Sequence, residues 1–488
     1  ASERRGDDEP MSAQTILSVG IDIGTSTTQV IFSKIAMENT AGFFSVPHVS
    51  IIDKEVVYKS PVYTTPLLND YLIDTKAVKE IVAGEFAGAG FRPEDTGSGA
   101  VIITGESARK ENSEAVLQSL SGFAGDFVVS AAGPDMESVI AGKGSGAFQY
   151  SLDEHCTVAN LDVGGGTTNI AVFKDGETIA RGCLDIGGRL IRVDEKGILT
   201  KLSPAAAKVA AQAGVSLRIG SPTGKRDLEK ITDLMAELMF AYLSGDGPYE
   251  RLLGEIITPG STVLSCPWKI DCICFSGGVA DAVYHDGKED FPYGDIGIVL
   301  GRSIRRSPKM LSYHLVPAGE TIRATVVGAG TYTTTVSGST ITYSENLFPL
   351  KNIPVLRMKR AEEEACFRGD SSELRKRIRW FLKQHDEKRM ILAMRGMKNP
   401  SYREVKLAAE SICEALVPEL EENVPVLLVF SSDIGKAMGQ LIRRQLGEGR
   451  PVIAVDGISV EDGDFVDMGK PVLDGLAIPV VIKTLIFG

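Results

Sequence analysis

The amino-acid sequence predicts an α/β fold with mainly parallel sheets. Apolar strand-like segments alternate with helical ones along most of the chain, as in strand–helix–strand units. Two separated stretches, residues 19–32 and 159–173, repeat the same strand–turn–strand pattern. At 488 residues the chain is expected to contain about three domains, because a domain typically takes roughly 150 residues.

The two repeated stretches, VGIDIGTSTTQVIF and ANLDVGGGTTNIAVF, each predict a β-hairpin whose tip can bind a phosphate. Asp22 or Asp162 ends the first strand of each, where a carboxylate can hold Mg²⁺ or its water shell. Glycines let the backbone approach a ligand closely, and hydroxyl groups add donors. Either hairpin alone is more often an ordinary turn, whereas the pair indicates two walls of one nucleotide site. The turns consist of Gly24, Thr25, Ser26 and Thr27 in the first hairpin and of Gly164, Gly165, Gly166 and Thr167 in the second.

A third segment, IDCICFSGGVAD at residues 270–281, predicts a flat surface that can lie against a nucleoside. An apolar strand is followed by Ser276, Gly277 and Gly278 and then by the start of a helix. Other nucleotide motifs are missing. The Gly-Lys pairs within residues 141–146 and 220–226 lack the Ser or Thr that follows in a P-loop, and no GxGxxG follows a strand.

The three motifs, in this order, resemble those of the ATPase superfamily of actin, sugar kinases and heat-shock chaperones. This resemblance implies two similar, ribonuclease-H-like α/β domains that flank a cleft for ATP and Mg²⁺. It also implies two segments that cross between the domains, residues 134–147 and 324–333.

The same resemblance implies roles for individual residues. Asp22 and Asp162 would hold Mg²⁺, and Glu137 or Asp162 would orient the attacking water. Gly187 and Gly188 would open a helix and approach the nucleotide. The hairpin turns would bind the phosphates. The adenosine loop would consist of Ser276, Gly277, Gly278 and Asp281.

The expected organisation has four parts. Residues 1–14 form a polar tail, 15–136 the first ATPase domain, and 137–333 the second with a crossing segment at each end. Residues 334–488 return to the first domain and add a C-terminal α/β region. Further strands are expected at 100–107 and 125–133. A helix over 227–243 has an apolar stripe that predicts core packing.

The C-terminal region exceeds what the ATPase core requires. Ser401 and Glu404 predict a capping box, and residues 424–457 predict a strand–helix–strand unit with Ser432 or Asp433 as the helix N-cap. Two roles stay open. The region either covers an exposed sheet of the core or recognises a partner through loop residues Asp433, Asp462, Asp464 and Asp467.

Composition excludes several classes of protein. The net charge of −12 disfavours binding to nucleic acid or to an anionic membrane, and no apolar run is long enough for a transmembrane helix. Seven cysteines without a secretory segment fit a reducing cytoplasm. Cys272 and Cys274 alternate along a strand, which favours core packing over metal binding, and the five histidines do not cluster into a zinc site or a triad.

A closer resemblance covers residues 15–488. Segments such as SGAVIITGES, LDVGGGTTNIAVF and GDFVDMGKPVLDG are similar to those of the family of ethanolamine ammonia-lyase reactivating factors. The resemblance implies an ATP- and Mg²⁺-dependent chaperone-like activity that releases damaged cobalamin from the lyase, so that intact adenosylcobalamin can enter. It implies a bacterial, cytoplasmic protein near the ethanolamine-utilisation microcompartment. Whether the protein forms a homodimer stays open. The alternatives are a non-hydrolysing nucleotide-binding scaffold and a small-molecule kinase of the same superfamily.

Overall fold

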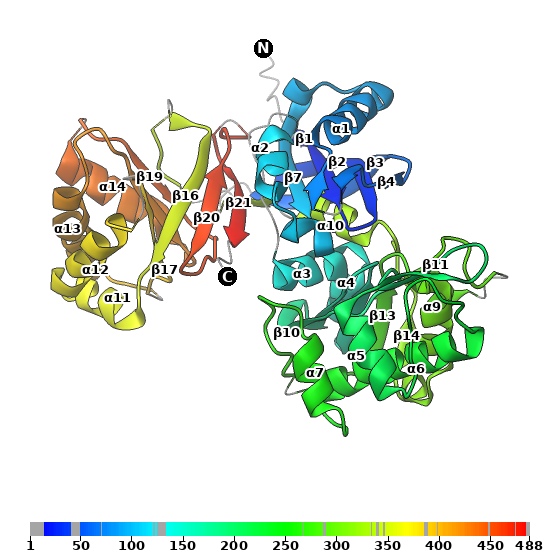
Figure 1. Ribbon diagram of the computed structural model, residues 1–488. Helices are drawn as coiled ribbons and strands as arrows, with labels where there is room; N and C mark the ends of the chain where they lie inside the picture. Colours follow the sequence, from blue (N-terminus) through cyan, green and yellow to red (C-terminus); the bar gives the residue numbers. More distant parts are fainter. Residues whose placement is uncertain are drawn as a thin grey trace, which may run out of the picture.

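The computed structural model of the chain describes the following residues: 14–40, 49–69, 71–120, 123, 133–266, 268–285, 289–332, 334–337, 341–344, 347–384, 389–397, 399–447, 449–473 and 475–484. They form two five-stranded sheets, one seven-stranded sheet and two two-stranded ribbons. Figure 1 shows the seven-stranded sheet to one side of the two five-stranded sheets. The expected tail and the strand expected at 125–133 lie outside the described residues, apart from their last positions.

The first sheet has the strand order β3-β2-β1-β7, with the short β4 also paired to β2. β1 and β2 form the first predicted hairpin, β3 continues antiparallel to β2, and β7 runs parallel to β1 on the other side. Helices α1 and α2 pack on one face of this sheet through buried apolar residues. The elements are β1 Gln14–Ile23, β2 Thr27–Asn39, β3 Val49–Lys59, β4 Tyr63–Thr64, β7 Thr96–Ile103, α1 Thr75–Ala89 and α2 Ser113–Leu120.

The second sheet repeats this plan in the order β10-β9-β8-β13-β14. β8 and β9 form the second hairpin, β10 is antiparallel to β9, and β13 runs parallel to both β8 and β14. Four strands of each sheet have the same order and directions, which confirms the actin-like fold with two ribonuclease-H-like units, whereas the fifth strand pairs with β2 in the first sheet and with β13 in the second. The strands are β8 Thr157–Val163, β9 Thr168–Lys174, β10 Glu177–Leu184, β13 Cys272–Ser276 and β14 His314–Val316.

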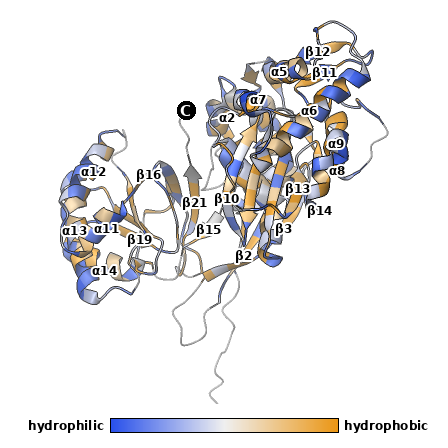
Figure 2. Cartoon of the chain, turned by 90° about the horizontal axis from the view of Figure 1, so that it is seen from below, coloured by the Kyte–Doolittle hydropathy of each residue, from blue (hydrophilic) through white to orange (hydrophobic). Residues whose placement is uncertain are grey.

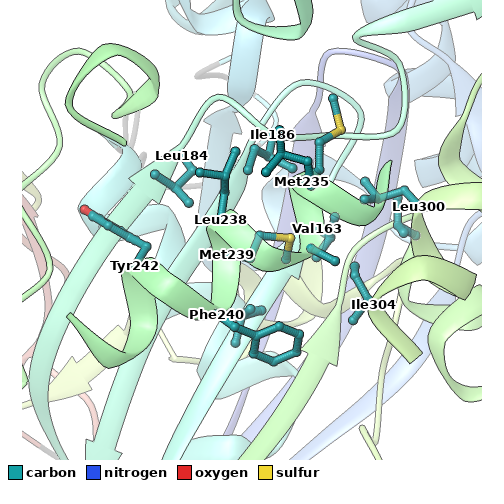
Figure 3. Packing of buried hydrophobic residues seen from close by; sticks show 14 of the residues in the cluster. Val163, Leu184, Ile186, Met235, Leu238, Met239, Phe240, Tyr242, Leu300 and Ile304 are labelled. Atoms are coloured by element: carbon teal, nitrogen blue, oxygen red, sulfur yellow. The ribbon is translucent and has the colours of Figure 1, made fainter. Parts of the chain in front are cut away.

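The largest core packs helices onto this second sheet. Figure 3 shows Met235, Leu238 and Met239 from α6 beside Val163, the last residue of β8. The apolar stripe predicted for residues 227–243 is buried, which confirms its core role, so α6 holds the strand that leads into the second hairpin turn. The helices of this core are α5 Pro204–Gln212, α6 Lys225–Ser244, α7 Glu250–Ile256, α8 Ala280–Tyr284 and α9 Gly297–Arg306, and α4 Ala147–Asp153 packs on β8 and β9 in a separate cluster.

Two glycine-rich helices, α3 (Pro134–Gly144) and α10 (Ala324–Tyr332), lie between the two five-stranded sheets (Figure 1). A β-carbon on Gly144 would overlap the carbonyl oxygen of Ala324, and one on Gly328 would overlap that of Ile140. Only glycine allows two helix backbones to approach so closely. The chain passes from the first sheet to the second through α3, and α10 then leads from the second sheet to the third.

The third sheet has the order β15-β21-β20-β16-β17-β18-β19, with β16 to β19 parallel. Its helices bury apolar residues against the parallel strands, and Figure 2 shows the hydrophilic colour on the outer sides of these helices. Its elements are β15 Thr334–Val336, β16 Leu350–Arg357, β17 Ile391–Met394, β18 Val426–Phe430, β19 Val452–Val455, β20 Asp464–Met468, β21 Pro479–Thr484, α11 Arg360–Phe367, α12 Ser372–Leu382, α13 Tyr402–Leu416 and α14 Gly435–Leu446.

The capping box of Ser401 and Glu404 is present at the start of α13, as predicted. The predicted cap of α14 is wrong, because its N-cap position is occupied by Ile434. The backbone N–H of Gly435 instead donates to Asp456, a buried residue that follows β19 (3.2 Å). A residue that follows another strand therefore pairs with an N–H at the start of this helix, which local spacing cannot reveal.

The last strands of the chain return to the first unit. Val481 of β21 packs in a cluster with Ile102, Ile140 and Ala329, and Val472, Leu473 and Ala477 pack against Ile35 of β2. Of the four acidic residues expected to face a partner, Asp433 is exposed, Asp462 pairs with Arg377 (2.5 Å), and Asp464 and Asp467 are buried. These contacts favour the covering role of the C-terminal region. Within the described ranges, no helix has the length and apolar character needed to cross a membrane.

Candidate nucleotide and metal site

The tips of the two repeated hairpins meet. A β-carbon on Gly165 in the second turn would lie 2.6 Å from Ser26 Oγ in the first turn. A β-carbon on Gly105, just after β7, would overlap Thr25 Oγ1 and lie 3.9 Å from Thr167 Oγ1. The fold thus brings the two predicted phosphate turns and the end of β7 to one place.

Each of the two turns is closed by its own backbone hydrogen bond. The N–H of Gly24 donates to the carbonyl of Thr27 (2.8 Å), and the N–H of Gly164 donates to that of Thr167 (2.9 Å). Hydroxyls of Thr65 (2.8 Å) and Ser107 (2.9 Å) donate to the Gly24 carbonyl and hold the first turn from two further segments.

Ser26 Oγ is buried and finds no hydrogen-bond partner among the described residues. A buried hydroxyl is normally paired, so this atom indicates a missing acceptor or donor at the tip of the first turn. A phosphate oxygen is an acceptor of the required kind. The chemistry of the turns therefore fits a nucleotide phosphate.

Three carboxyl groups lie buried near the turns: Asp22 (7% exposed), Asp162 (4%) and Glu137 (7%). Burial raises the pKa of Asp22 to about 7, although a hydrogen bond from Thr104 (3.0 Å) lowers it, and the Asp162 charge raises it further. Burial also raises the pKa of Asp162 to about 6, against hydrogen bonds from Ser276 and Thr325. Removing several anions from water is costly unless a cation joins them.

Glu137 lies in the first turn of α3 and accepts hydrogen bonds from the backbone of Gly105 and the side chain of Asn169. Burial, and then the charges of Asp162 and Asp22, raise its pKa well above the ordinary value. The structure thus places this carboxyl within the electrostatic reach of both aspartates.

The described residues contain no group of three or more His, Cys, Asp or Glu side chains that could hold a metal on their own. This arrangement still fits Mg²⁺, which is usually bound by one or two carboxylates, several waters and the phosphates of a nucleotide. Asp22 and Asp162 at the roots of the two turns would be those carboxylates.

The predicted adenosine loop lies between β13 and α8, as expected, and its residues differ in exposure. The Ser276 side chain is fully buried and donates to Asp162 Oδ1 (2.6 Å), so its hydroxyl is directed at this carboxylate. Gly277 has φ +87°, and a β-carbon there would overlap the carbonyl oxygen of Val163. Gly278 and Asp281 are exposed, and a β-carbon on Gly278 would meet no atom within 4 Å. Of the four residues predicted for this loop, Gly278 and Asp281 are the two whose side-chain positions a ligand can reach.

Gly187 and Gly188 do not open a helix. They lie in the turn between β10 and β11 (Ile191–Val193). Their expected closeness to the second hairpin is nevertheless observed, because Gly188 N–H donates to the Gly164 carbonyl (3.0 Å). A β-carbon on Gly187 would lie 2.5 Å from the Gly165 carbonyl oxygen.

Sequence reasoning missed the polar residues that surround the carboxylates. Thr104, Asn169 and Thr325 all donate to them, each from a different segment of the chain. The Thr104-Gly105 pair at the end of a predicted strand was the available signal for the first of these. The other two offered none, because an Asn in a strand and a Thr in an apolar helix have no distinctive spacing.

Two comparisons of the sequence with known proteins identify the same family. The sequence model of the family described as "Ethanolamine utilisation protein EutA" matches residues 14–488. A protein of Escherichia coli strain K12, described as "Ethanolamine ammonia-lyase reactivase EutA", is 35% identical over 482 residues, covering 98% of this chain and 100% of the relative. Its counterpart with the same description in Salmonella typhimurium strain LT2 is 34% identical over 486 residues, with the same coverage. The structure of ethanolamine utilization protein EutJ from Carboxydothermus hydrogenoformans matches 64% of this chain and 89% of its own, at 16% identity and a TM-score of 0.31.

Proposed function

Because the chain belongs to the EutA family of ethanolamine utilisation proteins, we propose that it is an ATP-dependent reactivating factor of ethanolamine ammonia-lyase. It promotes the exchange of damaged cobalamin for intact adenosylcobalamin in the lyase. The observation that supports the use of ATP is the meeting of two phosphate-type turns beside buried carboxylates. The protein works in the bacterial cytoplasm, near the ethanolamine-utilisation microcompartment.

The residues at the hairpins have distinct roles in this proposal. Asp22 and Asp162 hold Mg²⁺, which supplies positive charge against the phosphates when it is bound. Backbone N–H groups and hydroxyls of the two turns orient the phosphates, with Ser26 Oγ as a free donor. Gly278 and Asp281 face the adenosine. Glu137, held by Gly105 and Asn169, orients the water that attacks the terminal phosphate.

Reactivation is a shift of population in the partner enzyme. A lyase that has lost the adenosyl group retains inert cobalamin, so an outside protein must favour an open form by binding that form more tightly. Hydrolysis of ATP then changes the affinity of the factor and releases the lyase. The glycine contacts between α3 and α10, which join the two units, are where such a change would be absorbed.

The test measures release of cyanocobalamin from inactivated lyase. Wild-type protein with ATP and Mg²⁺ is compared with the same protein and a non-hydrolysable ATP analogue, and with Asp162→Asn and ATP. We expect release only with wild-type protein and ATP. Equal release in all three would identify a nucleotide-binding scaffold, and ATP turnover that needs a small-molecule acceptor would identify a kinase.

A further inference from the structure

A chain of buried, hydrogen-bonded side chains runs from the end of α3 to Asp162. Ser145 Oγ donates to Asn160 Oδ1 (2.8 Å), Asn160 Nδ2 donates to Ser276 Oγ (3.1 Å), and Ser276 Oγ donates to Asp162 Oδ1 (2.6 Å). All four residues are buried. These hydrogen bonds therefore lie in the protein interior, where hydrogen bonds are strong and each missing partner is costly.

Strand register explains how these side chains meet. Ser276 lies opposite Asp162 where β13 pairs with β8, and Asn160 is two residues before Asp162 on the same strand. Residues two apart on a strand point to the same face, so Asn160 and Asp162 both reach the Ser276 hydroxyl. The amide can only donate through Nδ2, and an ionised carboxylate can only accept. The Ser276 proton is thereby directed at Asp162.

The second carboxylate oxygen of Asp162 is held from another element. Thr325 Oγ1, near the start of α10, donates to Asp162 Oδ2 (3.4 Å). One oxygen is thus held from the sheet and the other from a helix between the two units. The carboxylate plane has little freedom to rotate.

We infer that Ser276 is a positioning residue for Asp162 and that its hydroxyl orients this carboxylate toward Mg²⁺. The inference rests on the proposed function and assigns Ser276 to the metal side of the site in place of the adenosine side. Residues that orient a metal ligand typically change metal affinity by about 10- to 100-fold when they are removed. The effect of losing the Ser276 hydroxyl should therefore depend on Mg²⁺.

The experiment uses the full chain and measures ADP binding by calorimetry, once with EDTA and once across a Mg²⁺ titration. In Ser276→Ala we expect ADP affinity in EDTA within about twofold of wild type and a Mg²⁺ midpoint raised about tenfold. In Ser276→Cys the side chain keeps a similar volume but is a weak hydrogen-bond donor. Its Mg²⁺ midpoint should therefore lie between those of the wild type and Ser276→Ala. Loss of ADP binding in EDTA would overturn the inference in favour of an adenosine contact, and an unchanged Mg²⁺ midpoint would overturn it outright.

Ser33→Ala is the matched control. Ser33 is also a fully buried serine in a strand, but its hydroxyl has no hydrogen-bond partner among the described residues. Its replacement should leave the Mg²⁺ midpoint unchanged, and a midpoint that rises as in Ser276→Ala would show a general effect of losing a buried hydroxyl. Wild-type protein that binds no nucleotide would refute the proposed function itself. Wild-type binding with an unaltered Ser276→Ala would refute only this inference.

Discussion

Gly165 of the second hairpin lies against Ser26 of the first, so close that a β-carbon on Gly165 would be 2.6 Å from Ser26 Oγ. The contact joins the two halves of the candidate phosphate site. Its neighbour Gly164 is in a different position, because a β-carbon there would be 3.5 Å from the Thr167 carbonyl oxygen, an ordinary contact distance. A side chain would therefore have less room at Gly165 than at the adjacent Gly164.

This difference predicts unequal effects of two alanine substitutions. Gly165→Ala should force the Ser26 hydroxyl aside and weaken ATP binding about tenfold, since overpacking typically costs about 1–3 kcal/mol. Gly164→Ala should change ATP affinity by less than about twofold. Calorimetric titration of both variants with ATP and Mg²⁺ checks this. Equal losses would mean that the turns do not touch across the site.

Glu137→Gln should change activity and stability in opposite directions. Burial and two neighbouring carboxylates raise the Glu137 pKa, so its ionised form destabilises the folded protein without ligand as pH rises. A neutral amide removes that cost, and the apo melting temperature at pH 8 should increase. ATP hydrolysis should fall by about 10²–10⁴-fold if Glu137 orients the attacking water.

The control for this prediction is ATP affinity, which should stay near the wild-type value in Glu137→Gln. Turnover and melting are measured on the same preparation. Undiminished hydrolysis would remove Glu137 from the reaction, and a lowered melting temperature would show that its hydrogen bonds to Gly105 and Asn169 outweigh its burial.

Gly277 and Gly278 should also respond differently, although the sequence suggests one role for both. Gly277→Ala combines a left-handed backbone (φ +87°) with an overlap onto the Val163 carbonyl, so it should lower the melting temperature of the apo protein. Gly278→Ala meets no atom and should leave the apo melting temperature unchanged, with weaker ADP binding in EDTA as its effect. Thermal unfolding without nucleotide separates the two. Equal melting temperatures would contradict the packing of Gly277 on β8.

Glu419 predicts a pH dependence in the C-terminal region. Hydrogen bonds from Arg379 and then Arg375 lower the pKa of Glu419 to about 2, although burial opposes the shift. A carboxyl group whose pKa is lowered on folding stabilises the fold at pH values above its unfolded pKa of about 4.3. This stabilisation is lost as the pH falls toward 2. Both arginines are about half exposed, so we expect only about 1 kcal/mol.

The measurement uses Trp380, which follows Arg379 on α12 and is one of two tryptophans in the chain. In a Trp268→Phe background, its fluorescence reports urea unfolding of this region between pH 6 and 2.5. Glu419→Gln should lower stability at pH 6 and have little effect at pH 2.5. A constant difference across this range would mean that the ion pairs contribute nothing that titrates.

Local patterns allowed much of the fold to be predicted. The two hairpins, the apolar stripe of α6 and the capping box of Ser401 depend on residues close in sequence, and each was observed. The repeated pattern of an Asp just before a Gly- and Thr-containing turn also located two of the buried carboxylates. Site residues could therefore be predicted where they lie within one segment of the sequence.

What the sequence did not reveal depends on contacts between distant segments. The direction of the Ser276 side chain follows from the pairing of β13 with β8, 114 residues apart at the Ser276–Asp162 bond. An N–H at the start of α14 is paired with Asp456, which follows β19. Gly187 was expected to begin a helix because Gly pairs often do so in the superfamily, but the chain here turns back toward Gly164.

The last prediction concerns removal of the C-terminal region. β21 pairs with β15, which directly follows α10, and Val481 of β21 packs against Ile102 of the first sheet and Ile140 of α3. A chain ending near residue 346 loses these partners and exposes the apolar face that they cover. We expect it to be insoluble or to bind no ATP, because the C-terminal strands complete the ATPase core.

Two point variants of the full chain make this prediction specific. Val481→Ala should destabilise the ATP-binding unit by about 1–3 kcal/mol and lower the melting transition that ATP raises. Val429→Ala, in β18 and equally buried, lies in a cluster confined to the third sheet and residues near it, so it should leave that transition unchanged. Differential scanning calorimetry with and without ATP distinguishes them. A soluble 1–346 fragment that binds ATP but no longer reactivates the lyase would show instead that the region serves partner recognition.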